Sequence, residues 1–128
     1  MKSKIIFDSN VWIGFLNIND TCYKRASRIF EDVDLTTVCI TEYILLEILT
    51  VLKQKTSYKK SNEFIELINK FNIEVITSQY FFKETLEIFE EFKENKLSFV
   101  DISLLYLSHK YEIITFDREL QKYIDKIK

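Results

Sequence analysis

The stretch Ile5-Ile6-Phe7-Asp8-Ser9-Asn10 contains the chain's first predicted strand and the start of its first predicted helix. An apolar run that ends in polar residues is typical of a short buried strand, here over 4–7. The same pattern returns late in the chain, where Asp117 follows Ile113-Ile114-Thr115-Phe116. Charged side chains are rarely buried without a partner. The two stretches therefore predict buried strands whose ends carry acidic residues that need a partner.

Strands are predicted at 4–7, 36–40, 73–77 and 112–116, and helices lie between them. Each predicted helix except the last begins at a residue that can cap it. The helices run from Ser9 or Asn10 to Leu16, from Asp20 or Thr21 to Glu31, from Thr41 to Lys55, from Ser57 to Phe71, from Ser78 to Asn95, from Ser98 to His109 and from Arg118 to Ile124. Strands that alternate with helices indicate a parallel α/β sheet with right-handed crossovers and helices on both faces.

Four acidic residues are expected to meet at one end of this sheet. Ligands of open α/β sheets bind beyond the carboxyl ends of the strands, and Asp8 and Asp117 follow the first and fourth strands. If these strands are neighbours, their axes are ~4.8 Å apart. Glu47 lies at the margin of an apolar helix stripe, and Asp101 lies in a first helical turn, which favours anions. Carboxylates brought together need protons or cations, and an oxygen-only ligand set suits Mg²⁺ or Mn²⁺.

Composition sets broad limits on the class of protein. A chain of 128 residues predicts one domain over 1–128, and 47% hydrophobic with 30% charged residues is ordinary for a soluble globular protein. No apolar run is long enough for a membrane span. Asp8 interrupts the N-terminal apolar run too early for a signal peptide, so we expect a cytoplasmic protein. Cys22 and Cys39 lack metal or redox spacing and are expected to stay reduced.

Charge and motifs leave some alternatives open. The net charge of −2 neither supports nor excludes a phosphate-rich substrate. Trp12 is expected in the core or in a subunit contact, or else stacked on a base. Two clusters of cations are either solvated surface or contacts to an RNA backbone. They are Lys53, Lys55, Lys59 and Lys60, and Lys24, Arg25 and Arg28. One histidine and one glycine exclude a two-histidine ribonuclease, a phosphate-binding loop and a GxSxG elbow within the chain.

The motifs that surround the four acids resemble those of PIN domains, most closely the VapC-type toxin ribonucleases. The matching stretches occur in the family's order and cover essentially the whole chain. They are Ile5-Ile6-Phe7-Asp8-Ser9-Asn10-Val11, Thr41-Glu42-Tyr43-Ile44-Leu45-Leu46-Glu47, Leu97-Ser98-Phe99-Val100-Asp101-Ile102-Ser103-Leu104-Leu105 and Ile114-Thr115-Phe116-Asp117-Arg118. Together the four stretches are fairly specific, although each alone is common.

The resemblance implies a three-layer α/β/α fold with a parallel sheet of four or five strands in the order 3-2-1-4-5. Only residues 121–128 remain for a fifth strand, and they contain no β-branched run. The resemblance also implies metal-dependent endoribonuclease activity, with Asp8 and Asp101 as the most direct ligands of Mg²⁺ or Mn²⁺. Glu47 and Asp117 would complete the charge.

Neighbouring polar residues are expected to support the acids. Ser9, Asn10, Ser98 and Thr115 are candidate hydrogen-bond donors to them. The Ser9 and Asn10 amides, at the start of a helix, are also expected to bind a phosphate oxygen.

The expected partners are RNA, a small antitoxin protein and a second copy of the chain. An antitoxin would cover the groove and place an Arg or Lys on the acids. Two alternatives remain open. One is a phosphatase-like phosphoryl-transfer enzyme, since Asp8-Ser9-Asn10 resembles the motif of dehalogenase-like phosphatases, which have Asp where Asn10 stands. The other is a catalytically inactive PIN-like binding module.

Overall fold

A computed structural model describes residues 3–93 and 96–127 of the chain. Its four strands, β1 (Ile5–Phe7), β2 (Val38–Thr41), β3 (Glu74–Ile76) and β4 (Glu112–Ile114), form one parallel sheet in the order β3-β2-β1-β4. The predicted neighbourhood of the first and fourth strands is confirmed: Phe7 pairs with Ile114. The strand order reverses at β1, so the carboxyl ends of β1 and β4 form the switch point where α/β proteins bind ligands.

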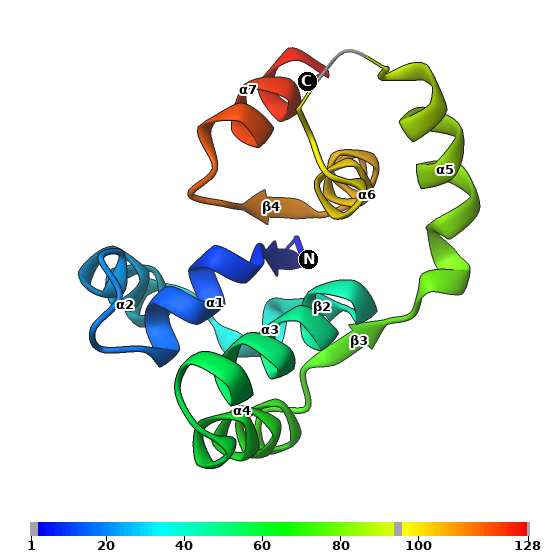
Figure 1. Cartoon of the computed structure of the whole chain (residues 1–128). Helices are drawn as coiled ribbons and strands as arrows, with labels where there is room; N and C mark the ends of the chain where they lie inside the picture. The colour runs from blue at the N-terminus through cyan, green and yellow to red at the C-terminus, as the bar shows by residue number, and fades with distance from the viewer. Residues whose placement is uncertain (1–2, 94–95, 128) are drawn as a thin grey trace.

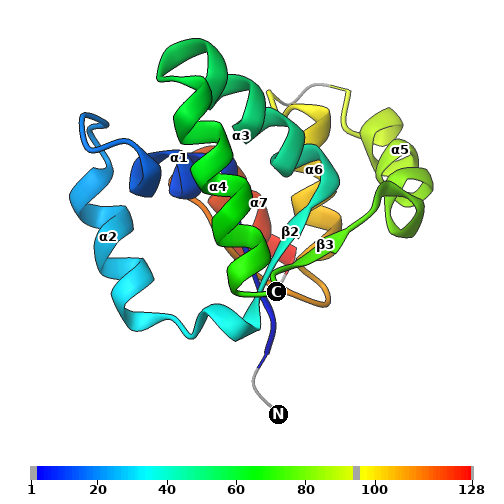
Figure 2. The ribbon, with the colours of Figure 1, turned by 90° about the horizontal axis from the view of Figure 1, so that it is seen from below.

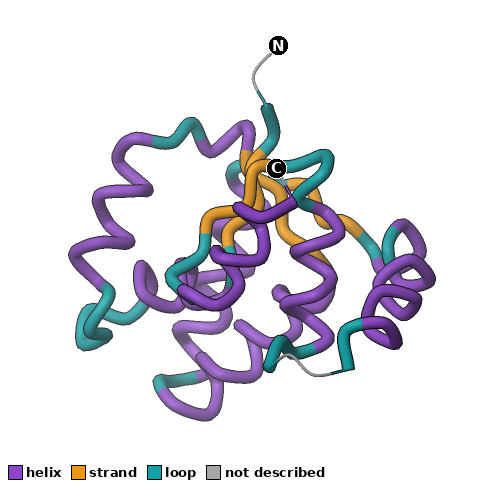
Figure 3. Tube along the Cα trace, turned by 90° about the horizontal axis from the view of Figure 1, so that it is seen from above, coloured by secondary structure: helices purple, strands orange, loops and turns teal. Residues whose placement is uncertain are grey.

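Helices flank both faces of this sheet, as the alternating pattern predicted. They are α1 (Ser9–Leu16), α2 (Tyr23–Asp32), α3 (Glu42–Lys55), α4 (Tyr58–Lys70), α5 (Phe82–Glu91), α6 (Phe99–Leu107) and α7 (Arg118–Ile127). Figure 1 shows α3 and α4 beside β2 and β3, and α6 and α7 beyond β4. In Figure 3 the strands gather into one group that the helices surround. None of the helices described is both long and apolar enough to cross a membrane.

The chain direction explains which helices share a face. The chain steps from β1 to β2 to β3 in one direction, and right-handed crossovers place α1 to α4 on the same side of the sheet. The step from β3 to β4 runs the other way and places α5 and α6 on the opposite side. The contacts agree: α1 packs on α2 and α3, α3 packs on α4, and α5 packs on α6. Figure 2 shows α3 and α4 running side by side, with α5 set apart.

Several element boundaries differ from the predicted ones. Asp8, not Ser9 or Asn10, caps α1. Residues Leu35–Thr37 form a 3-10 turn, which the Asp34 side chain caps by accepting from the Thr36 amide, so β2 begins at Val38. The predicted helix 78–95 is a 3-10 turn, Ser78–Tyr80, followed by α5, and its predicted end at Asn95 lies outside the described residues.

No fifth strand forms in the part of the chain that the structure describes. The residues available for it belong to α7, which continues to Ile127 instead of ending at Ile124. Leu120 and Ile124 of α7 are buried, and their spacing of four residues places both on one helical face. Helical periodicity therefore decides this segment, and the sheet keeps β4 at its edge.

An aromatic cluster fills the core between the sheet and its helices. Trp12 is 0% exposed and makes edge-to-face contacts with Phe7 and Phe64, and a further one with Phe30. Burying a Phe side chain contributes about 1.5–3 kcal/mol. The core interpretation of Trp12 is confirmed, and the alternative, a ring stacked on a base, is wrong because no part of the ring is accessible.

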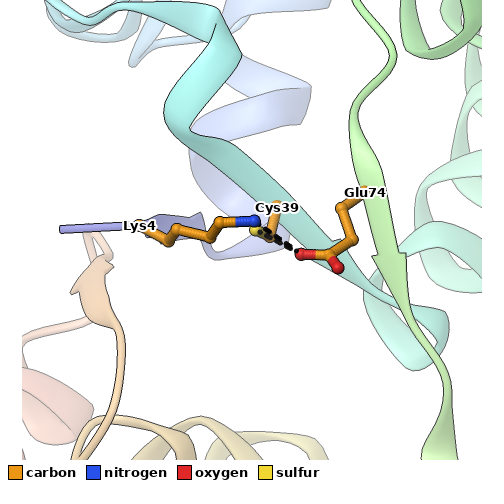
Figure 4. Close-up of polar contacts among 3 residues, drawn as sticks. All are labelled: Lys4, Cys39 and Glu74. Carbon is orange, nitrogen blue, oxygen red and sulfur yellow. Dashed lines mark hydrogen bonds and ion pairs between the residues drawn. The ribbon is translucent and has the colours of Figure 1, made fainter. Parts of the chain in front are cut away.

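A polar contact joins three strand segments at the end of the sheet opposite Asp8. Figure 4 shows the Lys4 side chain reaching past Cys39 toward Glu74. The Lys4 Nζ lies 3.1 Å from Glu74 Oε1, and the Cys39 thiol donates to the same oxygen at 3.4 Å. Burial raises the pKa of the Cys39 thiol to about 11, so it stays protonated and unreactive near neutral pH. Both cysteines are free, as predicted.

Candidate functional site

Asp8 lies at the switch point of the sheet and is 6% exposed. Its backbone amide donates to the Ile114 carbonyl at 2.9 Å, which extends the β1–β4 pairing by one step. Its backbone is still extended (φ −64°, ψ 160°), while its carbonyl accepts from the Val11 amide in the first turn of α1. The side chain is thus fixed at the junction of a strand and a helix, where sequence analysis expected it.

Both oxygens of the Asp8 carboxylate accept hydrogen bonds. Oδ1 accepts from the Ser9 amide at 2.7 Å, and Oδ2 accepts from the Thr115 hydroxyl at 2.7 Å. The Thr115 hydroxyl oxygen also accepts from the Asp117 amide at 3.0 Å. These bonds join the ends of β1 and β4. They leave at least one acceptor site on each carboxylate oxygen for a cation.

Burial and nearby negative charge raise the pKa of Asp8 above its usual range. Burial contributes most, the bonds from Thr115 and Ser9 oppose it, and the charges of Asp101 and Glu47 raise the pKa further. Two acids far apart in the sequence therefore act electrostatically on Asp8. A cation at this position would relieve both the burial cost and the repulsion.

Asp101 belongs to the first turn of α6, which begins at the carboxyl end of the sheet and runs back to the start of β4. Its Oδ2 accepts from the Ser98 amide at 3.0 Å, and the Ser98 hydroxyl accepts from the Asp101 amide at 3.1 Å. The two bonds form a capping box, with Asp in place of the usual Glu. Ser98 thereby fixes the Asp101 carboxylate, while Glu47 is exposed on the second turn of α3.

The Asp117 carboxylate accepts two backbone hydrogen bonds of its own. It follows β4, and its Oδ1 accepts from the Glu119 and Leu120 amides at 2.9 and 3.2 Å at the start of α7. Across residues 3–93 and 96–127, no three or more Asp, Glu, His or Cys side chains are arranged as a metal-binding group. The acids thus share one end of the sheet without forming a complete ligand set. Their all-oxygen chemistry fits a hard divalent cation.

Asn10 ties α1 to the segment that follows β4. Its Oδ1 accepts from the Phe116 amide at 3.2 Å, and its Nδ2 donates to the Thr115 hydroxyl at 3.5 Å. Asn10 therefore supports Thr115 and not an acid directly. The Ser9 amide, which was expected to bind a phosphate oxygen, donates to the Asp8 carboxylate in this structure.

The predicted lysine cluster lies at the junction of α3 and α4. Lys53 and Lys55 are exposed on the last turns of α3, and Lys59 is exposed on the first turn of α4. Lys60 forms an ion pair with Glu63 at 3.3 Å. Lys55 follows Glu47 by eight residues, which is a rise of about 12 Å along a helix. This cluster is thus a neighbour of the acidic end, not part of it.

One contact near the acids had no signal in the sequence. The Arg25 guanidinium carbon on α2 lies 4.3 Å from the centroid of the Phe116 ring. The sequence groups Arg25 with Lys24 and Arg28 in a cluster expected to be either solvated surface or a contact to an RNA backbone. Nothing in residues 20–31 indicates that one of them contacts the segment after β4, since the two are some ninety positions apart.

A cavity of about 360 Å³ lies away from the acids. Its lining includes Glu74, Tyr80, Tyr106 and Tyr111, and contains none of the four predicted site acids. The lining runs along the edge strand β3, from Glu74 to Ile76, and along the end of α6, so the cavity lies at the β3 edge of the sheet, away from the β1–β4 switch point. The chemistry therefore has to be sought at the carboxyl ends and not in this hollow.

Comparison with known proteins adds two findings. The family model described as "PIN domain" matches residues 5–126. Among the solved structures that match is a crystal structure of Mycobacterium tuberculosis VapC20, described as a sarcin-ricin loop cleaving toxin. The TM-score is 0.81 at 17% sequence identity, over 93% of this chain and 94% of that one, and at this identity the likeness shows a shared fold. No curated protein matches the chain significantly.

Proposed function

The chain belongs to the PIN domain family, and from that membership we propose that it is a metal-dependent endoribonuclease that hydrolyses RNA phosphodiester bonds. The observation that carries the proposal is Asp8: a carboxylate buried at the sheet's switch point, with a raised pKa and two further acids acting on it. A purely structural residue at this position would be less costly as an amide or a hydroxyl. We take residues 1–128 as one nuclease domain.

Asp8 and Asp101 are the proposed direct ligands of Mg²⁺ or Mn²⁺, and Glu47 and Asp117 the proposed remaining acids of the site. Such a cation activates water and neutralises charge on the phosphate. The chain's own contribution is to hold the acids in place. Thr115 orients Asp8, Ser98 orients Asp101, and Asn10 holds the segment that carries Thr115.

The proposed biological role is that of the toxin of a toxin–antitoxin pair, acting on cytoplasmic RNA. Its support is the fold shared with VapC20, a protein described as a sarcin-ricin loop cleaving toxin. The proposed antitoxin is a small protein that places an Arg or Lys on the acids, because a cationic side chain satisfies them as a metal ion would. Lys53, Lys55, Lys59 and Lys60 are proposed to contact the RNA backbone.

We further propose that the protein is a homodimer. A surface between α3, α5 and α6 exposes apolar side chains, which we call the α3–α5–α6 surface. Leu46 and Phe82 on it are 56% and 47% exposed. Its members are Tyr43, Leu46, Phe82, Leu86, Phe99 and Val100. A contiguous apolar patch of this kind is typical of a protein interface.

The deciding experiment incubates purified protein with total RNA and Mn²⁺ or Mg²⁺ and maps the cut ends. Wild type should cleave, and EDTA should abolish cleavage. Asp8→Asn should be folded and inactive, because it keeps the shape of the side chain but removes its charge. Full activity in EDTA, or in Asp8→Asn, would exclude the mechanism. Growth arrest on expression, relieved by co-expression of a small neighbouring protein, would test the toxin role.

A further inference from the structure

Arg25 occupies a defined position on the flank of the acidic end. Its guanidinium carbon lies 4.3 Å from the centroid of the Phe116 ring. Phe116 stands between Thr115, which donates to Asp8, and Asp117, which caps α7. The contact therefore attaches an exposed cation of α2 to the segment that holds the proposed catalytic carboxylate.

The Phe116 ring that Arg25 contacts belongs to a segment that a hydrogen bond holds in place. The Phe116 amide donates to Asn10 Oδ1 at 3.2 Å, and Asn10 lies in the first turn of α1, two residues after Asp8. Helices α1 and α2 approach closely where Gly14 faces Ala26. A Cβ built on Gly14 would lie only 3.3 Å from the Cβ of Ala26. Arg25 neighbours Ala26 on the same helix. Its backbone and its ring partner are thus both tied to the strand ends.

The Arg25 guanidinium forms no ion pair with an acidic side chain in the part of the chain that the structure describes. No Asp or Glu among residues 3–93 and 96–127 lies within 4.0 Å of its guanidinium; the ion pairs found there are Lys4–Glu74 and Lys60–Glu63. A guanidinium stacked on an aromatic ring keeps the N–H groups of its edge, which match the two oxygens of a phosphate. Stacking also reduces the side-chain entropy that binding would remove.

The acids create a need for such a cation. Asp8, Asp101, Glu47 and Asp117 all carry negative charge in the form that binds a metal ion, and they repel the RNA backbone. A metal ion can neutralise the phosphate that is cleaved, but not the phosphates beside it. A cation on the flank would hold a neighbouring phosphate and so orient the strand across the acids.

We propose that Arg25, stacked on Phe116, binds an RNA phosphate adjacent to the one that is cleaved. This inference rests on the proposed function. Arg25 is a binding residue in it and takes no part in proton transfer or metal binding. Two other outcomes compete: a purely structural cation–π contact, and a site for an acidic peptide.

The test measures binding separately from cleavage. The probe is a fluorescent single-stranded RNA oligonucleotide that contains a cleavage site mapped with the wild-type enzyme. Binding is titrated in EDTA, which suppresses the proposed cleavage, at several salt concentrations. Arg25→Ala should bind about ten-fold more weakly, and the slope of log K against log[salt] should become shallower by about 0.7, the value for one phosphate contact on a single strand.

Lys110 supplies a matched control, because it also lies over an aromatic ring. Its Nζ is 5.7 Å from the Tyr111 ring centroid, at the amino end of β4, whereas Phe116 follows the carboxyl end of the same strand. Lys110→Ala removes the same unit of charge and should leave affinity and salt slope unchanged. Arg25→Lys keeps the charge without the planar fork and should recover the salt slope with only part of the affinity.

Each possible result supports or overturns the inference about Arg25. Wild-type affinity and slope in Arg25→Ala overturn the inference, whether or not its thermal stability falls, because a structural contact alone would lower stability only. If Arg25→Ala does not fold, Arg25→Lys decides: wild-type affinity there overturns the bidentate contact. If an acidic peptide competes and RNA does not, the inference is overturned in favour of a protein ligand. If the wild-type protein neither binds nor cleaves RNA, the proposed function is overturned, and this inference with it. If the wild-type protein cleaves RNA and Arg25→Ala binds RNA as tightly as wild type does, only this inference is overturned.

Discussion

At the scale of single residues, the ionisation of Asp8 balances burial against hydrogen bonding. Burial disfavours the charged form, while the Thr115 hydroxyl and the Ser9 amide stabilise it, and the net effect is a raised pKa. The folded protein therefore holds the Asp8 proton more tightly than the unfolded chain. Stability from this group is present at low pH and falls as pH rises from about 3.9, the ordinary value for Asp, through the raised pKa of the folded state.

This sign predicts the effect of Asp8→Asn on stability. In EDTA at pH 7, the variant should have a larger free energy of unfolding than wild type, because it removes a charge that burial disfavours. The difference should shrink as pH falls toward 4, where the wild-type carboxylate takes up its proton. Urea unfolding between pH 4 and pH 7 measures it.

Wild type and Asp8→Asn can also be compared in the presence of a metal ion. Adding Mn²⁺ at pH 7 should raise the melting temperature of wild type and leave that of Asp8→Asn nearly unchanged, since a ligand stabilises only the state that binds it. A wild type that is more stable than Asp8→Asn at every pH in EDTA would contradict the assigned effect of burial.

At the scale of elements, capping residues decide where the functional carboxylates stand. Ser98 caps α6, and the reciprocal bond from its amide to Asp101 holds that carboxylate at the carboxyl end of the sheet. Ser57 caps α4 without such a reciprocal bond, through its hydroxyl, which accepts from the Lys60 amide at 3.1 Å. The two serines have the same role in their helices, but only the first touches a proposed metal ligand.

Replacing each serine with alanine separates stability from catalysis. Ser98→Ala and Ser57→Ala should each lower the free energy of unfolding by about 1 kcal/mol, the usual cost of a lost N-cap. Ser98→Ala keeps the backbone amide that donates to the Asp101 carboxylate but removes the hydroxyl that accepts from the Asp101 amide. It should therefore loosen the turn that carries Asp101 and lower kcat by about 10-fold or more, because a loosened ligand weakens a metal site. Ser57→Ala should keep the wild-type kcat. Equal kcat values for the two variants would show that the capping box does not position Asp101 for catalysis.

At the scale of the whole molecule, the α3–α5–α6 surface predicts the oligomeric state. Phe82→Asp places a charge in the middle of the proposed contact and should convert dimers to monomers, because a buried unpaired charge is costly. Ile18→Asp is the matched control: Ile18 is 72% exposed in the turn after α1. Sedimentation velocity at several protein concentrations reads out both. A monomeric wild type, or an unchanged Phe82→Asp dimer, would exclude this surface as the dimer contact.

Sequence reasoning recovered most of the fold, and particular residues show why. The caps Thr41, Ser57 and Ser98, and the positions of Asp8 and Asp101, follow from local patterns: an apolar run that ends in an acid, or a hydroxyl that opens a helix. The β1–β4 neighbourhood was implied by the resemblance to the PIN family, and the sheet confirms it. The cap of α1 was assigned one or two residues too late, because Asp8 both ends a strand and caps a helix.

The amino-acid sequence by itself determined the alternation of strands and helices and the acids that follow the first and fourth strands, because periodicity and helix caps are local properties of neighbouring residues, whereas the strand order came from the family resemblance. Only the tertiary structure decided which acid Thr115 binds, that no part of the Trp12 side chain is exposed, that the last helix continues to Ile127, and that Arg25 is stacked on Phe116. Each of these depends on contacts between segments far apart in the chain. Such contacts are set by how whole faces pack together, and no local pattern encodes them.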